Sequence, residues 1–272
     1  MEALCDLLFE LSNNDRISIL FELQKKPSNI SNLSKTLDFT PQATTRNMKR
    51  LVEIGLVRRN ENSDYVLTPY GATALDQLDS YIFISENKDY WSTHWTSHLP
   101  LEFSARLGEL KNCNRIDDPL DMVANLSRVF DEAEEGHLYM SPARITSHDS
   151  IQHIVDQLEK GTKIRAIEET DYKPTARSLA RTPKEQLRVI QGHWVKGNMD
   201  YRYLDEITVR MFLSEKEVSL LSFPKIDGEV DLSGFASSDP NFHGWCKDLF
   251  EYYWARGKTK TTFWTQPLLN NG

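Results

Sequence analysis

Cysteine is scarce in this 272-residue sequence, and the cysteines present form no metal-binding or disulfide motif. The three cysteines, Cys5, Cys113 and Cys246, lie far apart in the sequence and include no C-x-x-C pair. This scarcity favours a reducing compartment, which we expect to be the cytoplasm. It also argues against a structural metal site, and we expect neither a metal ion nor a cofactor.

Long apolar runs are absent too. No stretch reaches the roughly 18 apolar residues of a membrane-spanning helix, and the first 13 residues carry acidic side chains but no lysine or arginine, unlike a signal peptide. We therefore expect no signal peptide and no membrane partner. Those first residues instead predict a helix that packs on its own domain or on a second copy of the chain, with one apolar side formed by Leu4, Leu7, Leu8 and Leu11.

Positive charge is concentrated in one region of an acidic chain. The formal net charge of the whole sequence is −8. Between Asp15 and Arg59, nine lysines and arginines oppose four acidic residues, so this window carries +5 and the rest of the chain −13. A cationic window on an acidic protein indicates a binding surface for a polyanion such as nucleic acid.

The same window has the start signals of a winged helix-turn-helix. Helices are predicted to begin after Asp15, after Ser31 and at Thr40-Pro41, where a hydroxyl cap precedes proline in the first helical position. A two-stranded hairpin is predicted next, at 56–60 and 65–68. Thr68-Pro69 repeats the cap signal and begins a fourth helix.

The third helix, which this fold places in the DNA major groove, has an apolar and a polar side. Met48, Leu51 and Val52 should face the domain core. The polar side combines amide, hydroxyl and guanidinium groups, which read base edges or bind phosphates. Together with the basic first strand of the hairpin, it predicts contacts to double-stranded DNA from Gln42, Thr44, Thr45, Arg46, Lys49, Arg50, Arg58, Arg59 and Asn60. Because one such domain reads few base pairs, we expect a homodimer on paired half-sites. The first helix, from Glu2, and the fourth, from Pro69 to about Ile84, are the candidate dimer contacts.

The segment GLVRRN…YVLTPYGATAL resembles the wing of archaeal and bacterial winged-helix regulators of the ArsR/MarR type. The resemblance implies a DNA-binding transcriptional regulator. A winged helix also serves as a protein–protein module in some proteins. An adaptor that contacts protein partners of the transcription machinery therefore stays open as an alternative.

Short strands and helices alternate from residue 136 onward. Strands are predicted at 137–140, 163–167, 201–204, 208–213, 218–223 and 230–235, with helices at 150–160 and 174–191 and a last helix from Asp239-Pro240. Before them, Asp118-Pro119 begins a helix whose inner side should include Leu120, Val123, Leu126 and Phe130. We predict a winged helix-turn-helix domain at 1–84, a helical linker at 85–135 and a mixed α/β domain at 136–272.

The segments GTKIRAI, EVSLLSFPKIDGEVDLSGF and DPNFHGWCKDLFEYYWARG resemble the effector domain of archaeal regulators of the FilR1 type. The spacing of Trp245, Leu249, Phe250 and Trp254 is the clearest shared element. Such domains are related to the sugar-responsive TrmB sensors and to the phospholipase-D-like fold. The resemblance therefore implies an α+β to α/β fold class, in which a C-terminal sensor domain binds a small-molecule effector.

Polar and aromatic residues near the ends of the predicted strands are the candidate ligand contacts. They are Arg165, Glu168, His193, Trp194, Tyr201 and Tyr203. Arg165 would suit a carboxylate or phosphate, and the aromatic rings an acyl chain or a sugar. The same residues would also serve as sheet packing or solvated surface.

Catalytic motifs are missing. Phospholipase-D chemistry needs a histidine with a lysine two residues later, whereas His193 has Lys196 three residues later and no other histidine has the required spacing. Glycine-rich phosphate loops, dinucleotide fingerprints and nucleophile elbows are absent as well. We therefore predict a regulator that is not an enzyme. A nucleic-acid-processing enzyme with a dispersed active site is kept as the second alternative.

Overall fold

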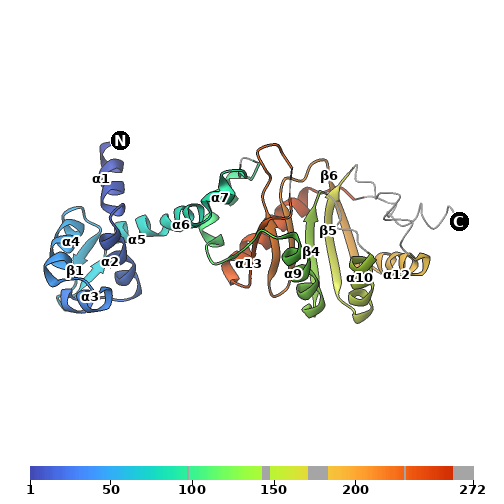
Figure 1. Ribbon diagram of the computed structural model, residues 1–272, viewed down its shortest axis with the longest axis horizontal. Coiled ribbons are helices and arrows are strands. Elements are labelled where there is room, and N and C mark those ends of the chain that lie inside the picture. The colour runs from blue at the N-terminus through green and yellow to red at the C-terminus, as the bar shows by residue number, and fades with distance from the viewer. Residues whose placement is uncertain (97, 143–147, 171–182, 230, 260–272) are drawn as a thin grey trace. The chain divides into compact units, whose positions relative to one another are not determined.

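The computed structural model divides the chain into an N-terminal unit, Met1–Tyr81, and a C-terminal unit, Ile82–Gly272 (Figure 1). It describes residues 1–96, 98–142, 148–170, 183–229 and 231–259, with the side chains of 148–150 excepted. The chain is an α+β protein whose C-terminal unit contains a mixed sheet.

The N-terminal unit has helices, then an antiparallel hairpin, then a further helix, the order predicted for a winged helix-turn-helix. The β1–β2 hairpin is called the wing below. In chain order the elements are α1 (Glu2–Leu11), α2 (Asn14–Lys25), α3 (Ile30–Leu37), α4 (Pro41–Glu53), β1 (Val57–Arg59), β2 (Tyr65–Leu67) and α5 (Pro69–Asp76). The last predicted helix is interrupted at Gln77, after which α6 (Leu78–Glu86) continues into the C-terminal unit.

Local capping determines where these helices begin. The Thr40 hydroxyl accepts a hydrogen bond from the backbone N–H of Ala43 at 3.2 Å, and Thr68 caps α5 in the same way, so both predicted Thr-Pro starts are confirmed. The other two predicted caps were wrong by two residues. Asn13 caps α2 and Asn29 caps α3, because asparagine is at least as good a cap as the aspartate or serine that follows it.

The C-terminal unit is built around a seven-stranded sheet of order β3-β9-β8-β7-β4-β5-β6. The strands β4, β5 and β6 are parallel, and the other neighbours are antiparallel. Its strands are β3 (Asn114–Ile116), β4 (Gly136–Ser141), β5 (Lys163–Glu169), β6 (Met199–Leu204), β7 (Arg210–Ser214), β8 (Val218–Ser222) and β9 (Gly234–Ser237).

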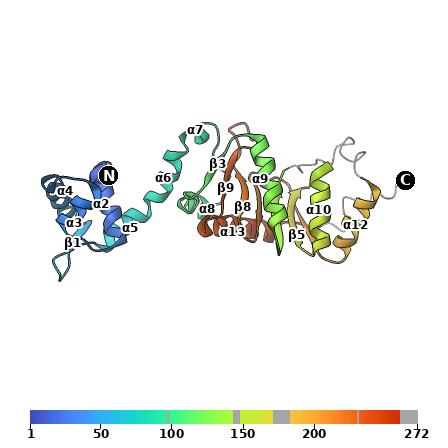
Figure 2. The ribbon, with the colours of Figure 1, turned by 60° about the horizontal axis from the view of Figure 1, so that its bottom comes forward.

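Helices cover both faces of this sheet (Figures 1 and 2). One apolar cluster joins a sheet face to α9 (Pro119–Glu132), α10 (His148–Lys160) and α12 (Lys184–Val195). A second cluster joins the opposite face to α13 (Pro240–Arg256) and to the segment with α6, α7 (Lys88–Trp91), α8 (Leu101–Ser104) and the 3₁₀ helix η1 (Leu107–Leu110). Trp245, Leu249 and Phe250 of α13 are fully buried in this second cluster.

Residues 85–135 differ from the predicted linker. Tyr90, Phe103 and Leu110 belong to the core of the C-terminal unit, and β3 adds an edge strand that the sequence did not predict. The start of α9 at Asp118-Pro119 is confirmed, but its predicted inner side is wrong in part, since Leu120 is 78% exposed and Met122 is buried instead. Local apolar spacing does not determine which side of a helix meets the sheet.

Two predicted elements lie partly outside the described residues. The helix predicted at 174–191 is described only from residue 183, and α12 begins at Lys184. The strand predicted at 230–235 is described as β9 from Gly234. Among the described residues, no helix combines the length and apolar character that crossing a membrane requires.

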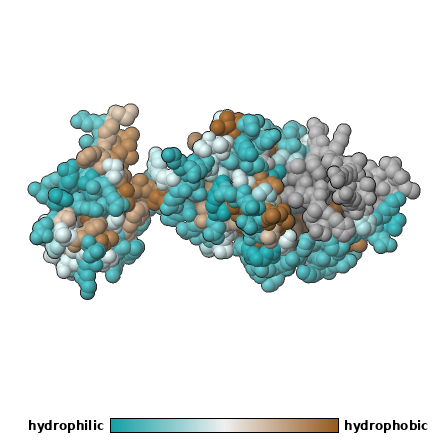
Figure 3. All heavy atoms as spheres, in the orientation of Figure 1, coloured by the Kyte–Doolittle hydropathy of each residue, from teal (hydrophilic) through white to brown (hydrophobic). Residues whose placement is uncertain are grey.

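Apolar side chains gather on the surface of α1 (Figure 3). Leu4, Leu8 and Phe9 are 50%, 48% and 61% exposed, whereas Leu11 is buried against the rest of the N-terminal unit. The end of α1 thus packs on its own domain, and its first two turns present apolar side chains to solvent. Val52, predicted to face the core from α4, is 42% exposed.

Candidate nucleic-acid interface and candidate ligand site

The polar side of α4 is open to solvent as predicted. Gln42, Thr45, Arg46 and Lys49 are all exposed. Within the described residues, Arg46 has no hydrogen bond or ion pair, and Lys49 has only a loose ion pair with Glu53, 3.8 Å between the charged atoms. The Thr45 hydroxyl donates to the Pro41 carbonyl at 2.7 Å, which leaves its oxygen free to accept. This surface is available to a nucleic acid without breaking internal contacts.

The opposite side of α4 is held by hydrogen bonds. Thr44 is fully buried, and its hydroxyl accepts from Ser34 of α3 at 2.9 Å and donates to the Thr40 carbonyl at 3.1 Å. Asn47 donates to the Asp15 carboxylate of α2 at 3.3 Å. The structure thus places Thr44, one of the predicted DNA contacts, inside the domain. Side chains one residue apart point in different directions on a helix, so Thr44 and Thr45 separate.

Arg50 is bound to α1. Its guanidinium donates to both oxygens of Glu10, with Nε distances of 3.1 and 3.2 Å, and Arg16 approaches the same carboxylate at 2.9 Å. Glu10 is only 3% exposed. The hydrogen bond from Arg50 and the charge of Arg16 hold the pKa of Glu10 below its usual value. Arg50 is therefore neutralised within the unit, although the sequence predicts it as a phosphate contact.

The predicted contacts of the wing also differ among themselves. Arg58 is exposed and has no hydrogen bond or ion pair among the described residues. Arg59 lies over the Tyr65 ring, 5.0 Å from its centre, and donates to the Tyr65 hydroxyl at 2.9 Å. The Asn60 side chain accepts from the backbone N–H groups of Asn62 and Asp64, both at 3.0 Å, and so shapes the turn. Arg58 is the predicted wing residue best placed for a phosphate.

The candidate ligand residues divide between the two faces of the sheet. Arg165 lies on the α13 face, where it forms a two-pronged ion pair with Glu251, 2.5 and 2.9 Å, and stacks on Trp254 at 4.1 Å. The hydrogen bonds from Arg165 lower the pKa of Glu251. Tyr201 and Tyr203 belong to the cluster on the opposite face. The structure therefore does not bring Arg165 together with the tyrosines.

Glu168 does lie with Tyr201. The hydroxyl of Tyr139 is 2.9 Å from the Glu168 carboxylate and 2.9 Å from the Tyr201 hydroxyl, and all three side chains are buried. Trp194 packs against the same cluster, while the His193 ring bonds to Asn198 at 3.1 Å in the turn before β6. Tyr139 was not among the predicted ligand residues. Its strand was predicted, but the parallel pairing that sets it beside Glu168 was not.

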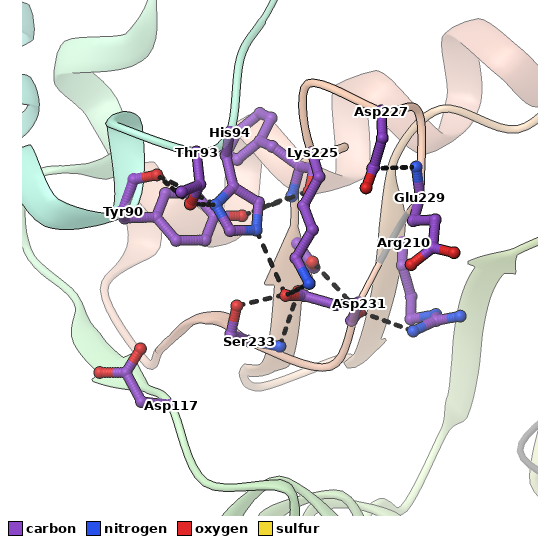
Figure 4. A network of polar contacts seen from close by, with 12 residues as sticks. Tyr90, Thr93, His94, Asp117, Arg210, Lys225, Asp227, Glu229, Asp231 and Ser233 are labelled. Carbon is purple, nitrogen blue, oxygen red and sulfur yellow. Dashed lines mark hydrogen bonds and ion pairs between the residues drawn. The ribbon is translucent and has the colours of Figure 1, made fainter.

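A second polar group at the sheet was missed altogether. Arg210, at the start of β7, donates to the Ser141 hydroxyl at 3.2 Å and to the Asp231 carbonyl oxygen at 2.6 Å (Figure 4). The Asp231 carboxylate is bound by Lys225 at 3.0 Å and by Ser233 at 2.8 Å. Burial alone would raise the pKa of Asp231, but the hydrogen bonds from Lys225 and Ser233 hold it below its usual value.

His94 is part of the same network. His94 and His98 have the H-x-x-x-H spacing of some metal ligands. The buried His94 ring is stacked on Tyr90 at 3.8 Å, and its Nε2 lies 3.4 Å from the Asp231 carboxylate (Figure 4). Throughout the described ranges, no three histidine, cysteine, aspartate or glutamate side chains gather as metal ligands would.

Comparisons with known proteins leave the family open. No protein-family model and no curated protein matches the sequence. A structural match is found with TrmBL2, described as an archaeal chromatin protein with a novel mode of DNA binding, at 13% identity, 91% coverage of this chain, 94% of that chain and a TM-score of 0.42. A second match is found with the phospholipase D family member Nuc from Salmonella typhimurium, at 14% identity, 56% and 99% coverage and a TM-score of 0.39. Because both TM-scores are below 0.5, we infer neither fold nor function from these similarities.

Proposed function

We propose that this chain is a DNA-binding transcriptional regulator, with α4 as the helix that enters the major groove. The observation that carries the proposal is the division of α4 into two sides. Ser34 and Asp15 hold its inner side through Thr44 and Asn47, and its outer side presents unpaired polar groups at the N-terminal half. A rigid helix with free amide and guanidinium groups is what base recognition requires.

The proposed contact set is narrower than the predicted one. Gln42, Thr45 and Arg46 occupy the first two turns of α4 and would read bases. Lys49 and Arg58 would bind phosphates. Arg50, Arg59 and Asn60 have internal partners and would contribute less, and the buried Thr44 is left out.

Selection of bound sequences from random double-stranded DNA tests the proposal. The full chain should enrich a palindromic consensus with half-sites about one helical turn apart. Arg46→Ala should lose the preference at one base position of each half-site, whereas Lys160→Ala, which removes one exposed positive charge from α10, should keep the full consensus. A pool that never departs from random would reject DNA recognition and favour the adaptor alternative.

A homodimer is part of the proposal, and α1 is the proposed contact. Its first two turns expose Leu4, Leu8 and Phe9, which in a monomer would lie in water. The helix carries acidic residues and no basic ones, so it does not suit a DNA contact. A second copy of α1 would cover these side chains and pair two recognition helices for a palindromic site.

Light scattering at tens of micromolar, with and without DNA, measures this directly. Leu4→Lys/Leu8→Lys should convert the dimer to a monomer. The matched control is Leu120→Lys, which places a lysine on another exposed apolar position, in α9. A wild-type protein that is monomeric under both conditions would contradict the dimer without affecting the assignment of α4.

We further propose that the C-terminal unit binds a small-molecule effector and that no catalytic step is involved. The supporting observation is the buried group of Tyr139, Glu168 and Tyr201 near the carboxyl ends of parallel strands. Open α/β sheets bind ligands outside these strand ends. The functional test is the affinity of the chain for its selected DNA, which should rise or fall when the effector is added.

A further inference from the structure

Helix α1 is attached to the rest of the N-terminal unit near its end. Of its ten residues, all of them described, only Glu10 and Leu11 are buried, and Leu7 packs partly against the core of the unit. Ser12 and Asn13 then separate α1 from α2. The first two turns carry the exposed apolar side chains that the proposed dimer uses. The direction in which these turns project therefore depends on the few contacts near the end of the helix.

Arg16, near the start of α2, holds the end of α1. Its Nε donates to the carbonyl oxygen of Glu10 and its Nη2 to the carbonyl oxygen of Phe9, both at 2.9 Å. The same Nε lies 2.9 Å from the Glu10 carboxylate. Because the last carbonyl groups of a helix have no partner within the helix, these hydrogen bonds cap α1. Arg16 therefore belongs to the joint between α1 and α2, and its side chain is 8% exposed.

Arg50 connects the same carboxylate to α4. It lies in the last turn of α4, one turn after Arg46, which is a proposed base contact. Its Nε lies 3.1 and 3.2 Å from the two carboxylate oxygens of Glu10, and its Nη2 also donates to one of them. A forked pair of guanidinium and carboxylate fixes orientation as well as distance. Glu10 is thus a direct link between the proposed dimer helix and the proposed recognition helix.

Phe9 brings this link next to the proposed dimer surface. The guanidinium groups of Arg16 and Arg50 both lie over its ring, each 5.7 Å from the ring centre. The Phe9 side chain is nevertheless 61% exposed, like Leu8 beside it at 48%. A second copy that covers Phe9 would shield the ion pairs of Glu10 from water, and an ion pair is stronger where water is excluded. Dimer contact and the pairing of Glu10 would therefore support each other.

The angle at which α1 is attached decides how far apart two recognition helices lie in a dimer held through α1. The helix has ten residues and is about 15 Å long at about 1.5 Å per residue. A tilt of about 15° at its end would move its first residues by about 4 Å, more than the ~3.4 Å rise of one base pair. Half-sites must match the separation of the recognition helices. Such a dimer therefore needs a fixed angle between α1 and α4.

We propose that Glu10 is a positioning residue that fixes α1 against α4 through Arg50, and so restricts the spacing of the half-sites that the dimer accepts. This role rests on the proposed DNA recognition by α4 and on the proposed dimer contact of α1. Arg16 holds α1 to α2 whether or not Arg50 is paired. Loss of the Arg50 pair alone should therefore leave the helix attached but allow its angle to vary.

Binding of the full chain to palindromes with shifted half-sites tests this role. The selected consensus is rebuilt with its half-sites moved closer together or further apart, one base pair at a time. The wild type should lose about tenfold in affinity per shift, the scale of the cost of deforming a duplex to restore alignment. Arg50→Gln should lose about threefold or less, because a variable helix angle replaces part of that deformation. Since the measured quantity is a ratio between spacings, a loss of affinity common to all spacings does not affect it.

Glu10→Gln separates positioning from a direct phosphate contact, because it breaks the same pair but keeps the Arg50 charge. A positioning role predicts the relaxed spacing of Arg50→Gln. A phosphate contact that Glu10 only neutralises predicts tighter binding at every spacing and an unchanged ratio. Should Glu10→Gln fail to fold, Arg50→Lys, which keeps the charge and loses the fork, should still relax the spacing. Lys35→Gln removes an exposed positive charge from α3 and is the matched control, which should keep the wild-type ratio.

The oligomeric state of the same preparations, measured by light scattering, separates this role from the proposed function. An unchanged spacing ratio in a dimeric Arg50→Gln protein overturns the positioning role and leaves the regulator and its dimer standing. A monomeric Arg50→Gln protein also overturns it, since the pair would then be needed for the dimer contact itself. Selection of an isolated half-site by the wild type would contradict the proposed dimer, and selection of no sequence would contradict DNA recognition. Either of these results overturns the positioning role as well.

Discussion

The two units bury charge in opposite ways. In the N-terminal unit, the carboxylate of Glu10 is enclosed by two arginines of the same unit, at 2.9 Å from Arg16 and 3.1 Å from Arg50. In the C-terminal unit, Arg210 is 7% exposed and, among the described residues, donates only to neutral oxygens, those of the Ser141 hydroxyl and the Asp231 carbonyl.

The difference indicates what each charge is for. A buried charge whose counter-charge lies inside the domain holds elements together, here α1 to α2 and α4. Such a charge is already neutralised and does not attract a charged ligand. A buried charge without one lowers stability until a ligand supplies the opposite charge. We therefore expect binding by the N-terminal unit to depend on salt, through exposed cations, and stability of the C-terminal unit to depend on pH and ligand.

The largest expected effect is a fall in the free energy of unfolding at acid pH, because His137 takes up a proton in the unfolded chain but not in the folded one. Burial lowers the pKa of His137 to about 4 from an ordinary 6.5. As the pH falls below 6.5 the unfolded chain takes up this proton and the folded chain does not until about pH 4, so the unfolded state is favoured across that window. Between about pH 7.5 and 4.5 the C-terminal unit should lose about 2.5 kcal/mol.

Urea unfolding followed by tryptophan fluorescence isolates this unit, since all six tryptophans lie beyond residue 90. His137→Leu should lose that part of the pH dependence. The control is His153→Asn, which should keep that pH dependence. The His153 side chain is 32% exposed and its ring is bound to Asp131. Equal pH dependence in His137→Leu and the wild type would show that His137 is not buried as described.

Removal of the Glu10 charge should give the next largest effect. Glu10→Gln leaves Arg16, whose side chain is 8% exposed, without a counter-charge, and should destabilise the N-terminal unit by about 2 kcal/mol. Because the arginines hold the pKa of Glu10 below 4.5, this contribution is present above pH 4.5 and is lost as the pH falls through the lowered pKa.

Circular dichroism detects unfolding of both units and tryptophan fluorescence only that of the second, so their difference reports on the N-terminal unit. Glu2→Gln, exposed on the same helix, is the matched control and should change little. An unaltered transition in Glu10→Gln would mean that α1 is not anchored through this carboxylate.

Arg46→Ala should weaken binding to the selected DNA by about tenfold or more, within the roughly 1–3 kcal/mol of a forked contact to a base. The loss should be confined to one base position, because a forked guanidinium contact reads a single base. Lys35→Ala removes an equal charge from α3 and should leave the base preference intact. A uniform loss across all sequences with Arg46→Ala would make Arg46 a phosphate contact instead.

The smallest expected effects distinguish three arginines by their salt dependence. Arg58→Ala should reduce the slope of log affinity against log salt by about one unit, as the loss of one phosphate contact does. Arg59→Ala and Arg50→Ala should change it less, since Tyr65 and Glu10 already bind these side chains. If all three variants change the slope equally, the contacts seen in the free protein are released on DNA.

Much of the N-terminal unit could be predicted from the sequence because its signals are local. Thr40-Pro41 and Thr68-Pro69 both begin helices as predicted, since a cap and the N–H it binds lie within three residues. The exposed side of α4 was predicted by the same periodicity, apart from Val52 and Thr44. The errors at Asp15 and Ser31 arose where two good capping residues stand close together.

Less of the candidate ligand site could be predicted. Glu168, Tyr201 and Tyr203 lie on one face of the neighbouring strands β5 and β6, and their role as ligand contacts stays a prediction. Arg165 was grouped with them although it lies on the other face of the sheet. Successive residues of a strand point to opposite faces, and the sequence alone did not show which residues of β5 face α13. Arg210 and Ser141 were missed, because no local pattern marks a side chain whose partner is 69 residues away in the sequence.

The sequence by itself determined where most helices and strands begin, where positive charge is concentrated, and that a helical N-terminal region precedes an α/β region. Those properties depend on residues within one or two turns of each other. Only the tertiary structure decided which arginines are free, that Thr44 is inside and Thr45 outside, that residues 85–135 belong to a core, and which side chains share one face of the sheet. Each of these properties depends on a partner that is distant in the sequence. Burial and pairing decide whether a charged side chain holds the fold together or is available to bind another molecule.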